Sequence, residues 1–180
     1  MVRGRGTGFN MESPFNMESS QFQEIERKFL VRDDRYLSEA FHSEEICQGY
    51  LSDAPERVVR IRIKGKRGFI TIKGKNSDDG TSRFEWEKDI PPEEARLLLE
   101  LCLPGRIEKT RYCVKSGAHT IEVDAFHGKL EGLVVAEIEL KSPDEPFERP
   151  EWLGQEVTGD PKYANAALSR LAAGLVVSGS

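Results

Sequence analysis

Apolar and polar residues alternate along most of the chain from Phe22 onward, with the two-residue period of a half-buried β-strand. β-Branched and aromatic residues are frequent in these segments, as is typical of strands. The alternation predicts eight strands, at about residues 22–31, 46–51, 57–64, 68–75, 82–90, 106–115, 119–126 and 133–141. Glycine-containing breaks such as KGKRG (64–68) and KSGAH (115–119) join several of them and favour hairpins between antiparallel neighbours.

Helical patterns are fewer than strand patterns. A first helix is expected near Asp34–Phe41, and a second over PPEEARLLLELC (91–102), where Pro and Glu precede leucines at helical spacing. A third is expected over PKYANAALSRLAAGL (161–175). The predicted fold class is therefore α+β, dominated by an antiparallel sheet.

The polar side of the predicted strands is charged, and the charges segregate by strand. In RVVRIRIK (57–64), for example, Arg60 and Arg62 lie opposite Ile61 and Ile63. The third and fourth strands are basic on this side, whereas the first and the last two are mainly acidic. A flat sheet with its charged side in water is one interpretation. Two or three helices are too few to protect the edges of eight strands, however, so we expect an eight-stranded antiparallel β-barrel with the charged side facing its lumen.

Composition sets limits on the function. The chain has 180 residues, 31 of them acidic and 26 basic, and a net charge of -5, which argues against nucleic-acid or membrane-surface binding. No apolar stretch approaches the ~20 residues of a membrane span. The three cysteines have no metal-site or disulfide spacing, which favours a reducing cytoplasm. Residues 1–20, which contain FNMES twice, are expected to be a disordered leader, and residues 21–175 a single domain.

Charges enclosed in a barrel need partners. Carboxylates are the ligands that Mg²⁺ and Mn²⁺ prefer, whereas Arg and Lys side chains suit phosphate oxygens. A linear polyphosphate or a nucleoside triphosphate chelated by a divalent metal satisfies both sets of charges. Glu24 and Glu26, which share one face of the first strand, are therefore candidate metal ligands.

An ordered series of motifs resembles the CYTH superfamily, also called the triphosphate tunnel metalloenzymes. The first strand carries the pattern E-x-E-x-K as Glu24, Glu26 and Lys28. The motifs that follow are QGYL (48–51), R-x-R (60–62), TIKG (71–74), FEWE (84–87), EKTRY (108–112), EVDAF (122–126) and AEIEL (136–140). The segment GQEVTGDPKYANAAL (154–168) is similar to the closing loop and helix of that superfamily, and the resemblance spans about residues 22–173.

The resemblance implies an eight-stranded tunnel that cleaves or rearranges triphosphates with Mg²⁺ or Mn²⁺. Within the superfamily the chain is most similar to short bacterial inorganic triphosphatases, which convert tripolyphosphate to pyrophosphate and phosphate. The implied metal ligands are Glu24, Glu26 and Glu139, followed by Glu122, Asp124 and Glu137. The implied substrate-binding residues are Lys28, Arg60, Arg62, Lys73, Lys109 and Arg111. Lys28 and Tyr50 are the implied catalytic pair, and Lys162 and Tyr163 are expected near the tunnel mouth.

Other functions stay open from the sequence. One alternative within the superfamily is an adenylate cyclase of the class IV type, and another is a nucleoside or thiamine triphosphatase. The HF dipeptide often found ahead of the motif in cyclases is absent, because Ser20 and Gln21 precede Phe22. A non-catalytic polyphosphate-binding module is an alternative from another class, and pairing of two tunnels into a homodimer is also possible.

Overall fold

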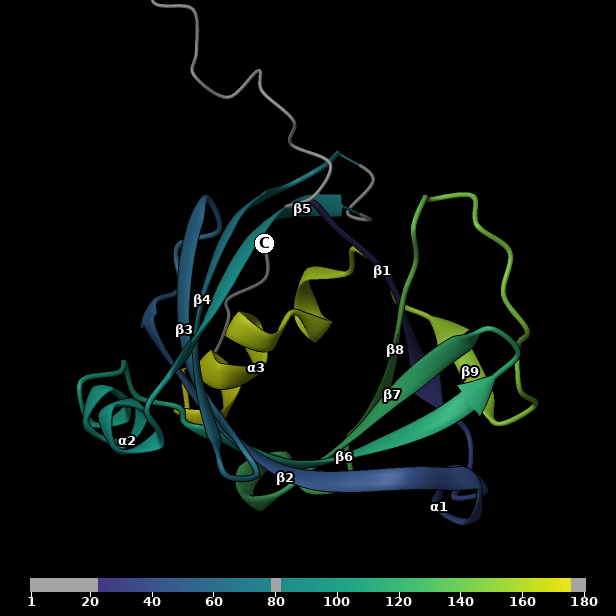
Figure 1. The fold of residues 1–180 in the computed structure, drawn as a ribbon, viewed down its shortest axis with the longest axis horizontal. Coiled ribbons are helices and arrows are strands. Elements are labelled where there is room, and N and C mark those ends of the chain that lie inside the picture. Colours follow the sequence, from purple (N-terminus) through teal and green to yellow (C-terminus); the bar gives the residue numbers. More distant parts are fainter. Residues whose placement is uncertain (1–22, 79–81, 176–180) are drawn as a thin grey trace, which may run out of the picture.

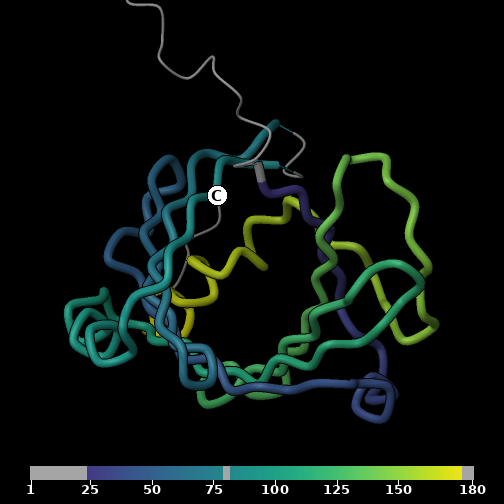
Figure 2. Tube along the Cα trace, viewed as in Figure 1, coloured from purple at the N-terminus to yellow at the C-terminus, as the bar shows by residue number. Residues whose placement is uncertain are grey.

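The computed structural model describes residues 23–78 and 82–175, and Figures 1 and 2 look into its ring of strands. The strands are β1 (Gln23–Val31), β2 (Ala40–Ser52), β3 (Arg57–Lys64), β4 (Arg67–Asn76), β5 (Ser82–Ile90), β6 (Ile107–Ser116), β7 (His119–Phe126), β8 (Val134–Glu139) and β9 (Leu153–Glu156). Their order is β5-β4-β3-β2-β6-β7-β8-β1-β9, and all neighbours are antiparallel. A further pairing of β5 with β1 closes eight of the strands into a barrel.

Strand β1 forms the closing seam of the barrel. Its first residues pair with β5, where Glu24 lies opposite Arg83. Further along, β1 pairs with β8, where Glu26 lies opposite Glu139. Strands β1 and β8, which each carry an E-x-E motif, are therefore neighbours, although they are more than a hundred residues apart in the sequence.

The apolar side of the strands faces outward and is covered by helices and loops. Helix α2 (Pro92–Glu100) packs Ala95 and Leu99 against Ile61 of β3. Gly68 of β4 permits this close approach, because a Cβ atom at that position would lie 2.8 Å from the Cβ of Ala95. On another part of the surface, Trp152 belongs to an apolar cluster with residues of β1, β7 and β8. The charged side of the strands consequently faces the lumen, as predicted.

One end of the lumen is apolar. Ile107, Phe126 and Val135 share the inward side of β6, β7 and β8 with the charged residues, and they pack against Leu168 of α3 (Asn165–Ala172). Helix α3 follows the 3₁₀ turn η3 (Pro161–Tyr163), and Figure 1 shows both lying within the ring of strands. Helix α3 thus fills one end of the barrel. The charged part of the lumen lies beyond this helix.

The structure confirms the predicted barrel and differs in local detail. The first helix, α1 (Tyr36–Glu39), is shorter than predicted, because the chain from Ala40 pairs with β6 and extends β2 toward its N-terminus. Strand β9 was not predicted, and its pairing with the end of β1 defines it. A short 3₁₀ turn, η2 (Gly128–Leu130), precedes β8. The expected leader, residues 1–20, lies outside the described residues, in which no helix is long and apolar enough to cross a membrane.

Candidate active site

The charged lumen contains two adjacent cavities. One has a volume of about 620 Å³ and the other about 900 Å³. The residues that line both cavities are Glu24, Glu26, Arg60, Lys73, Arg83 and Asn165. These shared residues lie at the boundary between the two cavities, which are therefore adjacent.

The basic wall of the lumen is formed by β3 and β4. Arg60, Arg62 and Lys73 are 6%, 9% and 5% exposed, respectively. The guanidinium groups of Arg60 and Arg62 contact Glu87 at 3.5 and 3.0 Å, but the Nε atom of each has no hydrogen-bond acceptor among the described residues. Arg and Lys side chains that line a cavity suit phosphate oxygens, so this wall is suited to an anionic ligand.

The closing seam holds a four-membered ion network. Lys73 contacts both Glu24 and Glu85 at 2.9 Å, and Arg83 contacts Glu24 at 3.0 Å. Burial raises the pKa of Glu24, but Lys73 and Arg83 outweigh it, and that pKa lies below its usual range. Burial and the hydrogen bond to Glu24 raise the pKa of Glu85 to about 7. Glu24 is therefore held ionised by two cations, whereas Glu85 gains a proton easily.

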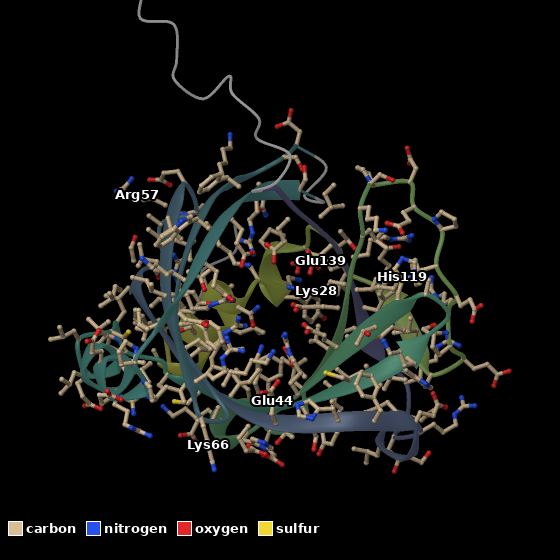
Figure 3. The ribbon with its side chains drawn as sticks, in the orientation of Figure 1. Lys28, Glu44, Arg57, Lys66, His119 and Glu139 are labelled. Atoms are coloured by element: carbon tan, nitrogen blue, oxygen red, sulfur yellow. The ribbon has the colours of Figure 1, made fainter. Side chains whose placement is uncertain are left out.

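Glu26 and Glu139 form the acidic wall. They are opposite one another on β1 and β8, and Figure 3 shows Glu139 and Lys28 inside the ring. Burial and the carboxylate of Glu137 raise the pKa of Glu26, while burial and Glu24 raise the pKa of Glu139. Negative charge is thus in excess at this pair, which is the condition for binding a cation.

Lys28 forms ion pairs with two acidic side chains. Its Nζ atom lies 2.9 Å from Glu137 and 3.7 Å from Glu26, and it donates a hydrogen bond of 3.3 Å to the carbonyl oxygen of Tyr163. Burial lowers the pKa of Lys28, but Glu137 and Glu26 outweigh it and hold that pKa above its ordinary value. Lys28 is accordingly a permanent cation at neutral pH.

Tyr50 lines the larger cavity together with Lys28. Its ring is buried, and its hydroxyl accepts a hydrogen bond of 3.5 Å from Gln48 Nε2. Burial raises the pKa of Tyr50 even though nearby cations oppose the shift, Arg60 most strongly. The phenol therefore stays protonated and can donate a hydrogen bond to a ligand in the cavity.

Arg111 joins the acidic side chains of β7 and β8. It makes two hydrogen bonds of 2.7 Å to Asp124, an ion pair with Glu122 and one of 3.4 Å with Glu137. Arg111, Glu122 and Glu137 all line the smaller cavity. Because Arg111 compensates these carboxylates, they carry less uncompensated charge than the pair of Glu26 and Glu139.

Lys109 and Asp124 form a buried ion pair. They are 1% and 2% exposed, respectively, they contact each other at 2.5 Å, and neither lines a cavity. Burial lowers the pKa of Lys109 to about 8, although Asp124 opposes the shift. Their positions on neighbouring strands pair them internally, and their roles as a phosphate contact and a metal ligand stay predictions.

The carboxylates fit a metal that is bound together with a phosphate ligand. No three His, Cys, Asp or Glu side chains of residues 23–78 and 82–175 converge as a ready-made metal site. Mg²⁺, however, normally takes one or two protein carboxylates and completes its shell with water and substrate phosphate oxygens. Glu26 and Glu139 supply such a pair, with oxygen donors that suit a hard divalent cation.

Two residues of the site were missed by the sequence reasoning. Arg83 was not assigned a role, although it stands two residues before Glu85 and therefore lies on the same, charged side of the strand. Asn165 gave no signal, because it follows a loop and reaches the lumen only through the placement of α3. Of the residues expected near the mouth, Lys162 lines the larger cavity and Tyr163 contacts Lys28.

Comparison with known proteins adds independent evidence. The inorganic triphosphatase of Acetivibrio thermocellus is 45% identical over 147 residues, which is 81% of this chain and 92% of that protein. The inorganic triphosphatase of Nitrosomonas europaea is 37% identical over 150 residues, covering 81% of this chain and 96% of the relative. A crystal structure of an inorganic triphosphatase aligns with a TM-score of 0.60 at 34% identity, over 87% of this chain and 97% of the other.

The model of the CYTH domain matches residues 23–168, which include every strand of the barrel and the first half of α3. The match begins at the strand that carries Glu24, Glu26 and Lys28. Together with the closed barrel and the charged lumen, this match shows that the chain belongs to the CYTH family.

Proposed function

We propose that this chain is a divalent-metal-dependent phosphohydrolase that cleaves inorganic triphosphate to pyrophosphate and phosphate inside its tunnel. The observation that carries the proposal is the lumen itself, where buried arginines and a lysine face two carboxylates, Glu26 and Glu139, whose pKa values burial and other nearby carboxylates raise. The names of the relatives from Acetivibrio thermocellus and Nitrosomonas europaea support the same substrate. Cations and carboxylates in one enclosed channel suit a metal-chelated polyanion better than either partner alone.

Glu26 and Glu139 are the proposed metal ligands, and Glu24 joins them when Lys73 and Arg83 turn to the substrate. A bound Mg²⁺ or Mn²⁺ would supply charge neutralisation at the phosphates and acidify a bound water. Phosphate release measured with Mg²⁺ and with Mn²⁺ would identify the preferred ion. We also keep a homodimer and a cytoplasmic location as predictions.

The basic wall binds and orients the phosphate chain in this proposal. Arg60, Arg62, Lys73 and Arg83 are held by Glu24, Glu85 and Glu87 in the free protein. A triphosphate offers stronger acceptors, so these cations exchange carboxylate partners for phosphate oxygens without a large movement. Positioning of this kind and electrostatic stabilisation account for most catalysis of phosphoryl transfer.

Lys28 and Tyr50 take roles that follow from their protonation states. Lys28 remains a cation and stabilises charge that develops on the phosphoryl group, which makes it a poor proton acceptor. Tyr50 remains a neutral phenol and acts as a hydrogen-bond donor near the same phosphates. Of the two roles open to Lys28, charge stabilisation and proton transfer, this proposal assigns it charge stabilisation.

The direct test is a substrate panel of tripolyphosphate, ATP, thiamine triphosphate and pyrophosphate with Mg²⁺ or Mn²⁺. We expect phosphate release to be fastest from tripolyphosphate and to require the metal. A second candidate, a nucleoside triphosphatase or adenylate cyclase, is favoured by one observation: Pro55, Val58 and Leu171 give the larger cavity apolar walls. Dominant release of cyclic AMP would replace the first proposal with that candidate, and binding without turnover would favour a non-catalytic module.

Arg83 supplies a prediction about binding. Replacing Arg83 by glutamine should raise the KM for tripolyphosphate about tenfold, because a charge-assisted hydrogen bond contributes about 1.5–3 kcal/mol. The fold should persist, since Lys73 continues to pair with Glu24. Steady-state kinetics would measure the effect, with Arg67→Gln as the matched control, because Arg67 makes an exposed ion pair with Asp89 outside both cavities. An unchanged KM for Arg83→Gln would remove Arg83 from the phosphate-binding set.

A further inference from the structure

A fully buried threonine lies within the basic wall of the lumen. Thr71 of β4 has no exposed surface, and it is paired with Arg60 of β3 on one side and with Glu87 of β5 on the other. Residues that face each other across paired strands point to the same side of the sheet, so these three side chains form one row on the lumen side. Thr71 belongs to the motif TIKG (71–74), in which only Lys73 has a role in the proposed function.

The hydroxyl of Thr71 joins the two charged groups beside it. Its Oγ1 atom donates a hydrogen bond of 2.6 Å to Glu87 Oε2 and accepts one of 3.3 Å from Arg60 Nη2. The same Glu87 oxygen accepts a hydrogen bond of 3.0 Å from Arg62 Nη2 and one of 3.5 Å from Arg60 Nη2. One carboxylate oxygen thus accepts hydrogen bonds from the threonine and from both arginines.

Thr71 is the rigid member of this group. Its β-branched side chain has few rotamers, it is enclosed, and it makes the shortest of the four hydrogen bonds. Arg60, Arg62 and Glu87 have longer side chains, and all three line the smaller cavity. Thr71 lines neither of the two cavities, so it does not touch a ligand there. The hydroxyl therefore fixes the carboxylate, and the carboxylate fixes the two guanidinium groups.

Glu87 is the shared counterion of two arginines that repel each other. Burial and the charge of Arg60 lower the pKa of Arg62 to about 10. Burial raises the pKa of Glu87, but Arg62 and the hydrogen bond from Thr71 outweigh it, and that pKa lies below its usual range. Glu87 is accordingly ionised at neutral pH. An ionised carboxylate in a fixed position keeps both guanidinium groups side by side, where they can bind one polyanion.

We propose that Thr71 is a positioning residue of the active site, whose hydroxyl orients Arg60 and Arg62, through Glu87, for the phosphate chain of the substrate. This inference rests on the proposed function, because it concerns the same basic wall. It adds a residue that touches neither substrate nor metal and sets the geometry of groups that bind the substrate. A threonine with only a structural role would contribute to stability and leave affinity unchanged.

The decisive variant is Thr71→Val, which keeps the shape of the side chain and removes the hydroxyl. The Kd of tripolyphosphate, measured by calorimetry without metal, and the KM measured with metal should both rise about fivefold, the effect of losing one hydrogen bond. Thr71→Ser keeps the hydroxyl and removes a methyl group. It should lose some stability and keep both constants close to those of the wild type.

Thr110→Val is the matched control. Thr110 of β6 is also buried and donates a hydrogen bond of 2.8 Å to a glutamate, Glu45, but neither residue lines a cavity. Both valine variants lose a buried hydrogen bond, so thermal unfolding should show a similar loss of stability in each. Only Thr71→Val should weaken tripolyphosphate binding. Affinity that follows stability across all three variants would indicate a structural role and overturn the inference.

A double-variant cycle tests whether Thr71 acts through Glu87. In a protein that already carries Glu87→Ala, the hydroxyl has no carboxylate to orient, so Thr71→Val should change the Kd much less than it does in the wild type. Effects of the two substitutions that multiply independently would overturn the inference. If Thr71→Val does not fold, Thr71→Ala takes its place in every comparison. All measurements are made at one ionic strength, because screening alters every charge effect.

The outcomes separate this inference from the proposed function. A wild-type protein that cleaves tripolyphosphate, with an unchanged Kd and KM in Thr71→Val, would overturn the inference alone, and so would a Thr71→Ser protein as weak in binding as Thr71→Val. A wild-type protein that binds tripolyphosphate without cleaving it, and whose binding is weakened by Thr71→Val but not by Thr71→Ser, would overturn the proposed hydrolysis and support the inference. A wild-type protein that neither binds nor cleaves tripolyphosphate would overturn both.

Discussion

Replacement of Glu26 by glutamine should abolish metal-dependent cleavage of tripolyphosphate and, at the same time, make the metal-free protein more stable. Glu26 faces Glu139 across two paired strands, and burial together with the Glu137 carboxylate disfavours its charge. Glutamine has nearly the same shape and removes the repulsion, which should raise the unfolding temperature by about 2–4 °C for about 1 kcal/mol. Loss of a metal-binding carboxylate should reduce kcat by about 10²-fold or more, since groups that stabilise the transition-state charge have effects of that size.

The measurement pairs thermal unfolding in a chelator with phosphate release over a range of Mg²⁺ and Mn²⁺ concentrations. Glu156→Gln is the matched control, because Glu156 of β9 makes an ion pair with Arg27 of β1 and lines neither cavity. That variant should keep its activity. Full activity of Glu26→Gln with Mg²⁺ would count decisively against the assignment of Glu26 as a metal ligand.

Replacement of Asp124 by asparagine should destabilise the metal-free protein strongly. Asp124 is the shared counterion of Lys109 and Arg111, and all three side chains are buried. Removing one partner of a buried ion pair leaves uncompensated charge and typically costs about 3–5 kcal/mol. For a chain of this size we expect the unfolding temperature to fall by about 10 °C or more.

Asp89→Asn serves as the comparison, because Asp89 forms an exposed pair with Arg67 whose loss should cost less than about 1 kcal/mol. Thermal unfolding in a chelator distinguishes the two possible roles of Asp124. If Asp124 were chiefly a metal ligand, its replacement would leave metal-free stability nearly unchanged and would weaken metal binding instead. That result would restore the role first expected from the sequence and contradict the structural one.

Much of this architecture is readable in the sequence. The two-residue alternation in RVVRIRIK (57–64) and its counterparts locates the strands of the barrel, and the charges on one side of them indicate an enclosed lumen. The spacing of Glu24, Glu26 and Lys28 identifies the strand on which the acidic wall begins. Periodicity is local, so it survives in the sequence without knowledge of the partner strands.

The allocation of roles among the charges is less readable. Glu122 and Asp124 have the same spacing as Glu137 and Glu139, yet Glu139 alone of the four has no ion pair among those found in residues 23–78 and 82–175. The difference comes from register, because β6 brings Arg111 opposite Asp124 while β1 brings Glu26 opposite Glu139. No pattern within a single strand contains that information.

The sequence by itself determined that some strands would carry basic and others acidic residues along one side of the sheet. It also indicated that an enclosed surface of this kind needs a metal-chelated polyanion. Tertiary structure alone decided that Lys109 and Asp124 pair with each other, that Glu26 and Glu139 lie opposite one another, and that the first turn of α3 lines the lumen. The physical reason is that side-chain periodicity depends on neighbouring residues of one strand. Charge pairing depends instead on which strands meet and in which register, because electrostatic energy falls off with distance in space and not along the chain.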